Sequence, residues 1–349
     1  MAEKIKTNFA ALNPVIRDYY VAPTEAVLRK DADVIQWGND NRYPDYLLSL
    51  YQDVGTLHSI IQGCVDYTLG NKIDVAEYTN SEGDTYEEVI RKITQDWFVF
   101  GGFAIQVIKN KLNETRELVH LPFQLVRSDE KNKVFYFSKD WSKSAGRIKY
   151  LVYPRYEKNM EGSTGVIYVK NNFGSVYPSP LYGSKTTIQA CEILKEISNF
   201  HYNQIQNGFM GGYSISFNDG EPDDKVKEEI ENDVINKFTG TGNAGRVLIN
   251  WARDKEHAIE VGKLETDDFA DKYTALNKKI QSDLFSAFRA TPNLFGLPSE
   301  NLGFNGQEYE ATFRLFNRTV VRPTQQKIIS AFKQAGIEVS ITPFSLDLE

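Results

Sequence analysis

The 349-residue sequence predicts an α+β fold in which two long helices enclose a small α/β module. Short β-branched and aromatic runs follow Gly101-Gly102 and are separated by polar, Gly or Pro residues, which is typical of strands and hairpins. Apolar residues recur at helical spacing over 185–207 and again over 266–290. Between these two stretches, strand and helix signals alternate. The chain therefore reads as an α+β part, a helix, a module, a second helix and a C-terminal part.

The first 184 residues combine an irregular start with helices and strands. Residues 1–40 carry two prolines and scattered charges, and predict an arm or an edge. Helical spacing runs from Tyr43 to Leu69, where Gly70 is a plausible stop, and a further helix is expected over Thr85–Phe98. Antiparallel strands are expected in FAIQVIKN, ETRELVHL, VFYFSK, RIKYLVYP and TGVIYVK.

The first long helix follows the turn YPSPLYGS, in which Ser184 is a good N-cap, and Gly208 ends it. Residues 209–262 then predict a separate module. Its order is a strand (YSISFN), a helix that starts at Pro222, a glycine loop and a second strand (RVLINW).

The C-terminal part begins where Thr291-Pro292 ends the second long helix. Residues 290–306 are rich in turn formers and predict a loop. A third helix is expected from Gln307 to Gly336, with a kink or restart at Pro323 because proline lacks the backbone N–H. The segment IEVSITPF predicts a closing strand.

Composition is that of an ordinary globular protein, with 41% hydrophobic and 25% charged residues. The net charge of −7 argues against a nucleic-acid binder with a basic footprint, and it is compatible with a protein that encloses DNA. Cys64 and Cys191 lie far apart in apolar helical patterns, which favours buried reduced thiols. No signal-peptide or membrane-spanning pattern occurs, so we expect a cytosolic protein with no membrane partner.

No catalytic residue, metal site or cofactor is expected. The sequence has neither a nucleophile elbow nor a P-loop. Asp267-Asp268 would be paired carboxylates, but acidic residues are common at a helix start because of the helix dipole. The four histidines lack the spacing of a metal site; they are His58, His120, His201 and His257.

The stretch from Gly240 to Gly245 matches G-x-G-x-x-G, a pattern found in nucleotide-binding loops. Such a loop leaves a strand and opens a helix, so that phosphates meet the helix N-terminus. Here the expected order is reversed, because the loop leaves a helix and enters a strand. Gly240 suits a helix C-terminus, and Gly242 and Gly245 suit turns. A nucleotide-binding enzyme that uses this loop remains the alternative hypothesis.

Several segments carry a resemblance through their order and spacing over about 280 residues. They are WGNDNRYPDYL, FVFGGFAIQVI, LVHLPFQLVR, YPSPLYG, the QNG that ends the first long helix, GNAGRVLI and FRATPNLFGLPSENLGFNGQEYEATFRLFNRTVVRP. Together they resemble the portal proteins of tailed bacteriophages, in the HK97-like and PBSX-like lineage. Each segment alone is weakly specific.

The resemblance implies a portal fold with an α/β wing, long stem helices and a small α/β clip. The implied ranges are the wing 1–184, the first stem helix 185–208, the clip 209–262, the second stem helix 263–290, the tunnel loop 291–306, and a C-terminal helix and strand returning to the wing over 307–349. Two features depart from the family. Phe209-Met210-Gly211-Gly212 stands where a proline is common, and the chain stops soon after the last strand, so any crown is expected to be minimal or absent.

The implied function is non-enzymatic. The family forms a ring, dodecameric in virions, at one capsid vertex, as a head–tail connector and a conduit for DNA packaging and ejection. Implied partners are further copies of the chain, double-stranded DNA without sequence specificity, the terminase large subunit, a head–tail adaptor, and a capsid or scaffold protein. The implied location is the virion, with host cytoplasm during assembly, from a phage or prophage. A self-assembling interaction protein unrelated to phages is the other alternative.

Three groups of residues are candidates for this function. Lys278 and Lys279 would face DNA from the second stem helix, although a solvated helix face fits equally well. Gly240, Gly242 and Gly245 would shape the clip turn, where a ring meets its motor or adaptor. The candidate tunnel-loop residues are Asn293, Leu297, Ser299, Glu300, Asn301, Leu302, Phe304 and Asn305.

Overall fold

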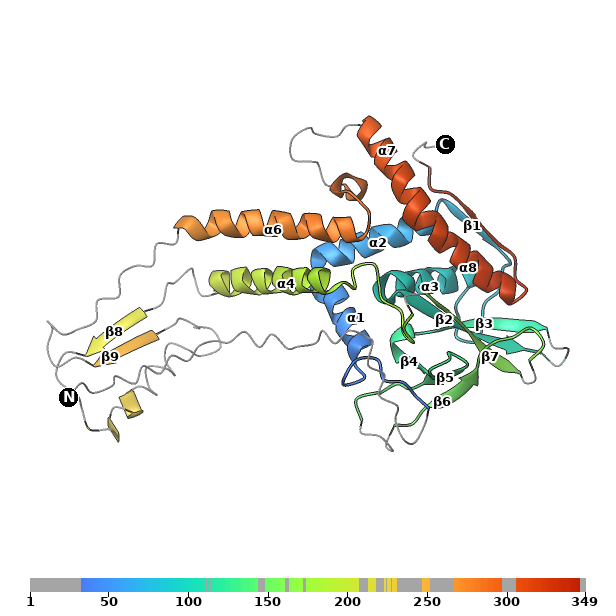
Figure 1. Cartoon of the computed structure of the whole chain (residues 1–349), viewed down its shortest axis with the longest axis horizontal. Coiled ribbons are helices and arrows are strands. Elements are labelled where there is room, and N and C mark those ends of the chain that lie inside the picture. The colour runs from blue at the N-terminus through green and yellow to red at the C-terminus, as the bar shows by residue number, and fades with distance from the viewer. Residues whose placement is uncertain are drawn as a thin grey trace. The chain divides into compact units, whose positions relative to one another are not determined.

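The chain forms helices and several antiparallel sheets, which confirms the α+β class expected from the sequence (Figure 1). The computed structural model describes residues 33–110, 112, 114–143, 148–160, 163–171, 174–206, 213–217, 223, 225–226, 228–230, 247–251, 267–296 and 306–345. The chain divides into two compact units. The first consists of Met1–Lys185 with Ala287–Glu349, and the second of Thr186–Ser286.

Three helices open the described part of the first unit. They are α1 (Tyr43–Asp53), α2 (Gly55–Leu69) and α3 (Tyr86–Phe100). The expectation of one helical stretch from Tyr43 to Leu69 is wrong at Val54, where the backbone is extended with φ −104° and ψ 97°. Gly55 follows directly, and glycine weakens a helix at that point through its conformational entropy. The break is part of the core, because the Val54 side chain is buried.

Helix α3 has well-defined ends. Thr85 and Glu88 form a capping box, in which each side chain accepts a hydrogen bond from the other residue's backbone N–H. Gly101 ends the helix in the left-handed conformation with φ 81°, which glycine adopts without a steric cost. This turn leads straight into the first strand of the main sheet, and α3 packs against that strand.

Two three-stranded antiparallel sheets form most of the β-part of the first unit. The first has the order β3 (Thr115–Leu121), β2 (Gly102–Lys109), β7 (Thr164–Lys170). The second has the order β4 (Val126–Ser128), β5 (Val134–Phe137), β6 (Leu151–Pro154). All the strands expected from the sequence in this region are present. The three-residue β4 was not expected, since the short 3-10 turn η1 (Phe123–Leu125) interrupts its apolar pattern.

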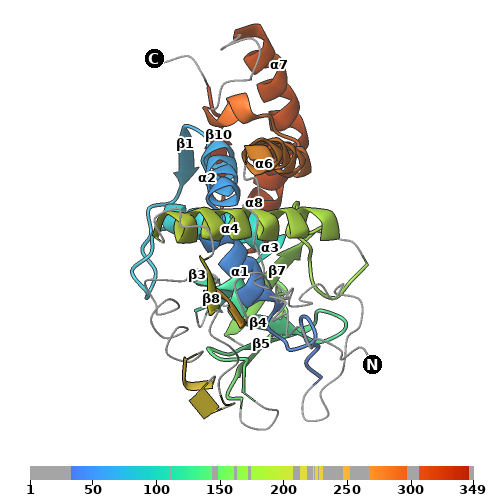
Figure 2. The same cartoon turned by 90° about the vertical axis from the view of Figure 1, so that its left-hand side faces the viewer.

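The closing strand of the chain is confirmed as β10 (Val339–Thr342). It pairs antiparallel with β1 (Lys72–Val75), which follows α2 after a two-residue turn (Figures 1 and 2). The sequence gives little signal for β1, because the four residues KIDV are too few to show alternation. This pairing fixes the C-terminal strand to the beginning of the first unit.

The C-terminal helix is interrupted, as Pro323 leads one to expect. Helix α7 (Gly306–Phe316) passes into a π-helical segment, η4 (Asn317–Val321), and then into α8 (Arg322–Gln334). Pro323 stands in the first turn of α8, where a missing N–H costs least. The wider turn of the π segment precedes the proline and accommodates its ring.

The second unit contains two long helices and a strand pair. Helix α4 (Lys185–Gln206) and helix α6 (Asp267–Ala287) match the two long helices expected from the sequence. Strands β8 (Tyr213–Phe217) and β9 (Val247–Trp251) pair parallel, with Tyr213 opposite Val247. Parallel neighbours need a crossover connection. This agrees with the expected order of strand, helix and strand, and residues 225–226 and 228–230 are helical.

Candidate functional site

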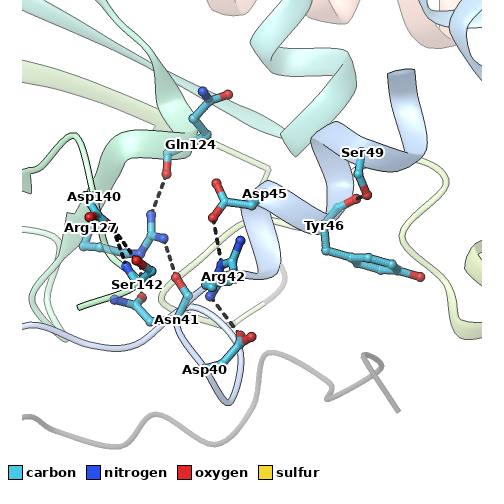
Figure 3. Close-up of polar contacts among 10 residues, drawn as sticks. All are labelled: Asp40, Asn41, Arg42, Asp45, Tyr46, Ser49, Gln124, Arg127, Asp140 and Ser142. Atoms are coloured by element: carbon cyan, nitrogen blue, oxygen red, sulfur yellow. Dashed lines mark hydrogen bonds and ion pairs between the residues drawn. The ribbon is translucent and has the colours of Figure 1, made fainter. Parts of the chain in front are cut away.

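Arg127 is the centre of a fully buried polar junction in the first unit. Its Nε donates to Asn41 Oδ1 at 2.6 Å, and one terminal nitrogen donates to the Asn41 carbonyl at 2.6 Å. The other terminal nitrogen donates to the carbonyls of Gln124 at 2.8 Å and Val126 at 2.9 Å. Figure 3 shows the guanidinium between Asn41 and Gln124. A buried cation is tolerated only where its donors are satisfied, and here four contacts do so.

Aromatic faces complete the surroundings of this guanidinium. Its central carbon lies 5.0 Å from the centre of the Trp141 ring and 5.8 Å from that of Trp37. Cations are attracted to the negative face of an aromatic ring, most strongly when both are shielded from water. Arg127 is therefore held by carbonyl dipoles and by two tryptophan rings.

The junction joins three of the segments that carry the sequence resemblance. Asn41 adopts a left-handed backbone with φ 62°, and its Oδ1 accepts from Trp37 N at 3.0 Å. The Trp37 ring stacks on Tyr177 at 4.6 Å. The Tyr177 hydroxyl donates to the Ile35 carbonyl and accepts from Ser128 N. WGNDNRYPDYL, LVHLPFQLVR and YPSPLYG thus meet at one point.

A second set of contacts fixes the two places where the chain leaves and re-enters the first unit. The Tyr182 hydroxyl donates to the Val99 carbonyl at 2.7 Å, and its ring stacks on Phe288 at 5.8 Å. A side chain at Gly101 would overlap the backbone at Ser179. Tyr182, shortly before α4, therefore contacts both the end of α3 and Phe288, which directly follows α6.

The loop segment between α6 and α7 is anchored by Tyr67 of α2. The Tyr67 hydroxyl donates to the Leu294 carbonyl at 2.6 Å and lies 2.9 Å from the Tyr309 hydroxyl. Leu294 precedes residues 297–305 and Tyr309 follows them. Burial, and then the hydrogen bond with Tyr309, raise the pKa of Tyr67, so its hydroxyl stays protonated as a donor.

Aromatic rings surround this hydrogen-bonded pair. The ring of Phe295 lies against Gly63 of α2, in space that a side chain at Gly63 would occupy. Tyr67 also contacts the rings of Phe313 and Phe316, each at 5.7 Å, and that of Phe344 at 4.9 Å. We call this set the loop anchor; its members are Gly63, Tyr67, Leu294, Phe295, Tyr309, Phe313, Phe316 and Phe344. It brings both sides of the loop to one helix.

The candidate residues from the sequence fall into three groups in the structure. Asn293 is buried in the short 3-10 helix η3 (Pro292–Phe295), where the Thr291 hydroxyl donates to its side chain. Lys278 and Lys279 are exposed on α6. The remaining candidates lie outside the described residues; they are Leu297, Ser299, Glu300, Asn301, Leu302, Phe304, Asn305, Gly240, Gly242 and Gly245. The strand expected directly after the glycine loop is β9.

Sequence reasoning missed a partly buried contact between a histidine and an aspartate. His120 Nε2 lies 2.7 Å from Asp96 Oδ2, and the same oxygen accepts from Phe123 N at 3.2 Å. The pair joins α3 to β3 and has the character of a structural link. Within the described ranges, no group of three or more His, Cys, Asp or Glu side chains is arranged to hold a metal ion.

Both thiols are buried and free, as the sequence indicates. Burial raises the pKa of Cys64, and it raises that of Cys191 to about 12. Thiols in such surroundings are poor nucleophiles because the thiolate is disfavoured. Among the helices of the described part of the chain, none has the length and apolar character to cross a membrane.

Replacing Tyr67 with phenylalanine is expected to lower the free energy of unfolding by about 1–2 kcal/mol, because the buried Leu294 carbonyl loses its donor. Tyr309→Phe should cost less, since Tyr67 still reaches Leu294. Tyr202, 63% exposed on α4, gives the control Tyr202→Phe, expected to be neutral. Urea unfolding of the three variants measures these differences. Equal stability of Tyr67→Phe and Tyr202→Phe would contradict the anchor.

Comparison with solved structures shows which known proteins this fold is similar to. A chain in the neck of a native gene transfer agent (GTA) particle, computed with C12 symmetry, aligns with 86% of this chain and 84% of its own length, at 16% identity and a TM-score of 0.51. A chain in the virion of the native GTA particle aligns with 85% of this chain and 83% of its own length, at 15% identity and a TM-score of 0.51. An HK97 family phage portal protein from Corynebacterium diphtheriae covers 91% of this chain and 96% of its own, at 8% identity and a TM-score of 0.48.

At these identities the likeness concerns the fold. The resemblance predicted from the sequence is confirmed at that level by structures from particle necks and virions. No protein-family model matches the sequence, and no curated protein does so either.

Proposed function

We propose that this chain is a portal-type subunit, which forms a ring through which double-stranded DNA enters and leaves a particle. The observation that carries the proposal is the fold shared with a neck chain over 86% of this sequence. A neck joins a head to a tail, and this position agrees with the head–tail connector expected from the sequence. In this proposal, residues 1–184 form the wing, α4 and α6 the stem, and 209–262 the clip.

The finer parts of the proposal concern ring size and partners. The matched neck is computed with C12 symmetry, which supports a twelve-membered ring for this chain at the capsid vertex. The clip would dock the terminase large subunit during packaging and the head–tail adaptor afterwards. The wing would contact a capsid or scaffold protein. Such a ring assembles in the host cytoplasm and remains in the virion.

Exposed apolar residues on the long helices support self-association. Ile193 and Tyr202 on α4 are 40% and 63% exposed, and Leu276 on α6 is 41% exposed. In a ring, these apolar side chains would be buried against another molecule. Further copies of the same chain are the simplest partner for a closed ring.

A non-enzymatic role agrees with the chemistry of the described residues. The thiols are buried, and His120 is engaged with Asp96 in a structural link. The competing nucleotide-binding enzyme depends on Gly240–Gly245. The strand β9 begins two residues after this loop, so the loop enters a strand where a phosphate-binding loop would open a helix.

Electron microscopy and light scattering of the purified chain test ring formation. Ile193→Glu and Leu276→Glu are each expected to shift rings toward smaller species. Each loses a buried apolar contact worth about 2 kcal/mol at every interface, which corresponds to about 30-fold weaker association. Asn199→Glu adds the same charge at an exposed polar position of α4 and should leave the rings intact. A wild-type protein that stays monomeric at every salt and protein concentration would count against the portal.

A further inference from the structure

A row of exposed cations follows the C-terminal helix across α7, η4 and α8. Its members are Arg314, Arg318, Arg322 and Lys333, with Lys327 at its flank, and all five are exposed. From Ala311 to Gln334 the sequence contains these five cations and no acidic residue, whereas the whole chain has a net charge of −7. We call Arg314, Arg318, Arg322 and Lys333 the basic row.

The π segment keeps the row straight. In an α-helix each residue turns about 100°, so a residue four positions on overshoots a full turn by about 40°. The i→i+5 turn of a π-helix is wider, so residues four apart fall short of a full turn. The step from Arg314 to Arg318 is mostly α-helical and overshoots a full turn, whereas the step from Arg318 to Arg322 runs through η4 and falls short of one. The two deviations therefore offset one another. Lys333 lies eleven residues after Arg322, which is close to three α-helical turns.

The opposite face of the same helix is buried in the first unit. Its buried positions are Phe316, Val320, Val321, Thr324, Gln325, Ile328, Ala331 and Phe332. Figure 1 shows α7 and α8 following one another as a long rod. The helix is thus anchored by one side and carries its cations on the other.

The cations of the row are available for a ligand. Arg314 forms an exposed pair with Glu310, with 3.3 Å between Nη2 and Oε2. In the part of the chain that the structure describes, no ion pair is formed by Arg318, Arg322 or Lys333. Exposed ion pairs such as that of Arg314 contribute little to stability, so the pair can be replaced by a contact with a ligand.

We propose that the basic row binds the phosphate backbone of duplex DNA, an inference that rests on the proposed function. The row spans about 28 Å at 1.5 Å per residue. A duplex of that length presents about sixteen phosphate charges, at one per roughly 1.7 Å. Arginine forks fit phosphate oxygens in a bidentate geometry. Backbone contacts of this kind give affinity without sequence specificity.

Phosphates fit the surroundings of the row better than an acidic protein surface. Between Arg322 and Lys333 the other exposed positions are Pro323, Gln326, Lys327 and Ser330. Protein interfaces usually have an apolar or aromatic core, which this stretch lacks. The exposed Leu315 on α7 would be the anchor of the competing occupant, an acidic protein surface.

The row also differs from the lysines that the sequence singles out on α6. Asp283 follows Lys279 by four residues, so the two lie on one helix face, and both are exposed. A carboxylate at that place offsets the attraction of a lysine for phosphate. In the basic row only Arg314 has such a neighbour, Glu310. Arg318, Arg322 and Lys333 have none among the described residues, so the row is the stronger site for a polyanion.

The test measures fluorescence anisotropy of a labelled 20-base-pair duplex with the assembled full-length protein between 50 and 200 mM NaCl. The variant Arg318→Gln/Arg322→Gln/Lys333→Gln is expected to lower the salt dependence, the slope of log K against log[salt], by about 2.7. Each phosphate contact contributes about 0.9 to this slope. Glutamine keeps a high helix propensity, so α8 should persist.

Three comparison variants make the outcome specific. Lys131→Gln/Lys133→Gln/Lys139→Gln removes the same charge from exposed positions near β5 and should bind DNA like the wild type. Arg318→Lys/Arg322→Lys keeps the charge and should retain most of the salt dependence, which guards against misfolding of the glutamine variant. Lys278→Gln/Lys279→Gln compares the α6 lysines directly and should have the smaller effect.

The results separate this inference from the proposed function. Rings that bind the duplex equally well with and without the basic row would overturn the inference and leave the portal intact. A second outcome would also overturn the inference: the glutamine variant no longer forms rings in electron micrographs, but its free subunits bind DNA unchanged. The basic row would then belong to a contact with a protein partner. A chain that never forms rings would refute the portal, whatever its affinity for DNA.

Discussion

Replacing Arg127 with alanine is expected to lower the free energy of unfolding by about 4 kcal/mol. The change removes four hydrogen bonds inside the core and leaves carbonyls of Asn41, Gln124 and Val126 without their donor. It also opens a cavity between Trp37 and Trp141. Urea unfolding followed by tryptophan fluorescence measures the loss, because both rings flank the guanidinium.

Arg42 offers a matched control only one residue from Asn41. Its side chain is 55% exposed, and its Nε lies 3.4 Å from Asp45 Oδ2 (Figure 3). Exposed ion pairs of this kind contribute little to stability, so Arg42→Ala should lower the free energy of unfolding by about 0.5 kcal/mol or less. If the two alanine variants unfold at the same urea concentration, the junction does not hold the three segments together.

Arg127→Lys distinguishes charge from geometry. Lysine keeps the positive charge but has one nitrogen in place of the planar fork, so it cannot serve Asn41 and Gln124 together. We expect a loss of about 2 kcal/mol or more. A lysine variant as stable as the wild type would mean that the charge alone, and not the fork, matters at this position.

The sequence predicts most of the helices and strands because their apolar spacing is regular over many residues. It predicts less where a contact between distant segments decides the structure. Arg127 is not among the candidate residues that the sequence indicates. Its burial depends on Asn41, 86 residues away, whose left-handed backbone places an oxygen toward it. Nothing in local spacing indicates that pairing.

The loop anchor was only partly accessible from the sequence. The turn formers after Ala290 predict a loop, and η3 lies at its beginning. Its attachment to α2 depends on the Tyr67 hydroxyl and on the Phe295 ring against Gly63, and helical spacing indicates neither contact. One signal was available: Gly63 lies in the interior of α2, and glycine inside a helix often marks a close approach by another segment.

The basic row illustrates the same limit. The four-residue spacing of Arg314, Arg318 and Arg322 is visible in the sequence, and in a regular α-helix it would describe a slowly rotating stripe. The π segment that straightens it could not be predicted from Pro323 alone, which indicates only a kink. The straight alignment of the four cations, which suits a straight and charged ligand, can therefore be recognised only in the structure.

Replacing Gly63 with valine is expected to lower the free energy of unfolding by about 3 kcal/mol. The added side chain would occupy the space of the Phe295 ring, so the ring must leave its place between α2 and Phe316. Helix propensity acts in the opposite direction, because glycine is the poorer helix former by a few tenths of a kcal/mol. Steric displacement is the larger effect, and the variant should lose stability on balance.

Gly55 provides the control within the same helix. No atom of the described residues lies within 4 Å of the position that its Cβ would take, and the residue is at the exposed start of α2. Gly55→Val is therefore expected to change stability by about 0.5 kcal/mol or less. Two identical substitutions, eight residues apart in one helix, should thus differ several-fold in their effect on the urea midpoint.

A double-mutant cycle connects this difference to the loop. In a Phe295→Ala background the space beside Gly63 is empty, so Gly63→Val should cost less than about 1 kcal/mol. The coupling of about 2 kcal/mol that results would assign the penalty to the Phe295 contact. If Gly63→Val were equally costly in both backgrounds, α2 would be disturbed for another reason. Since Phe295 is the last ring before residues 297–305, its seat on Gly63 sets where that loop leaves the core.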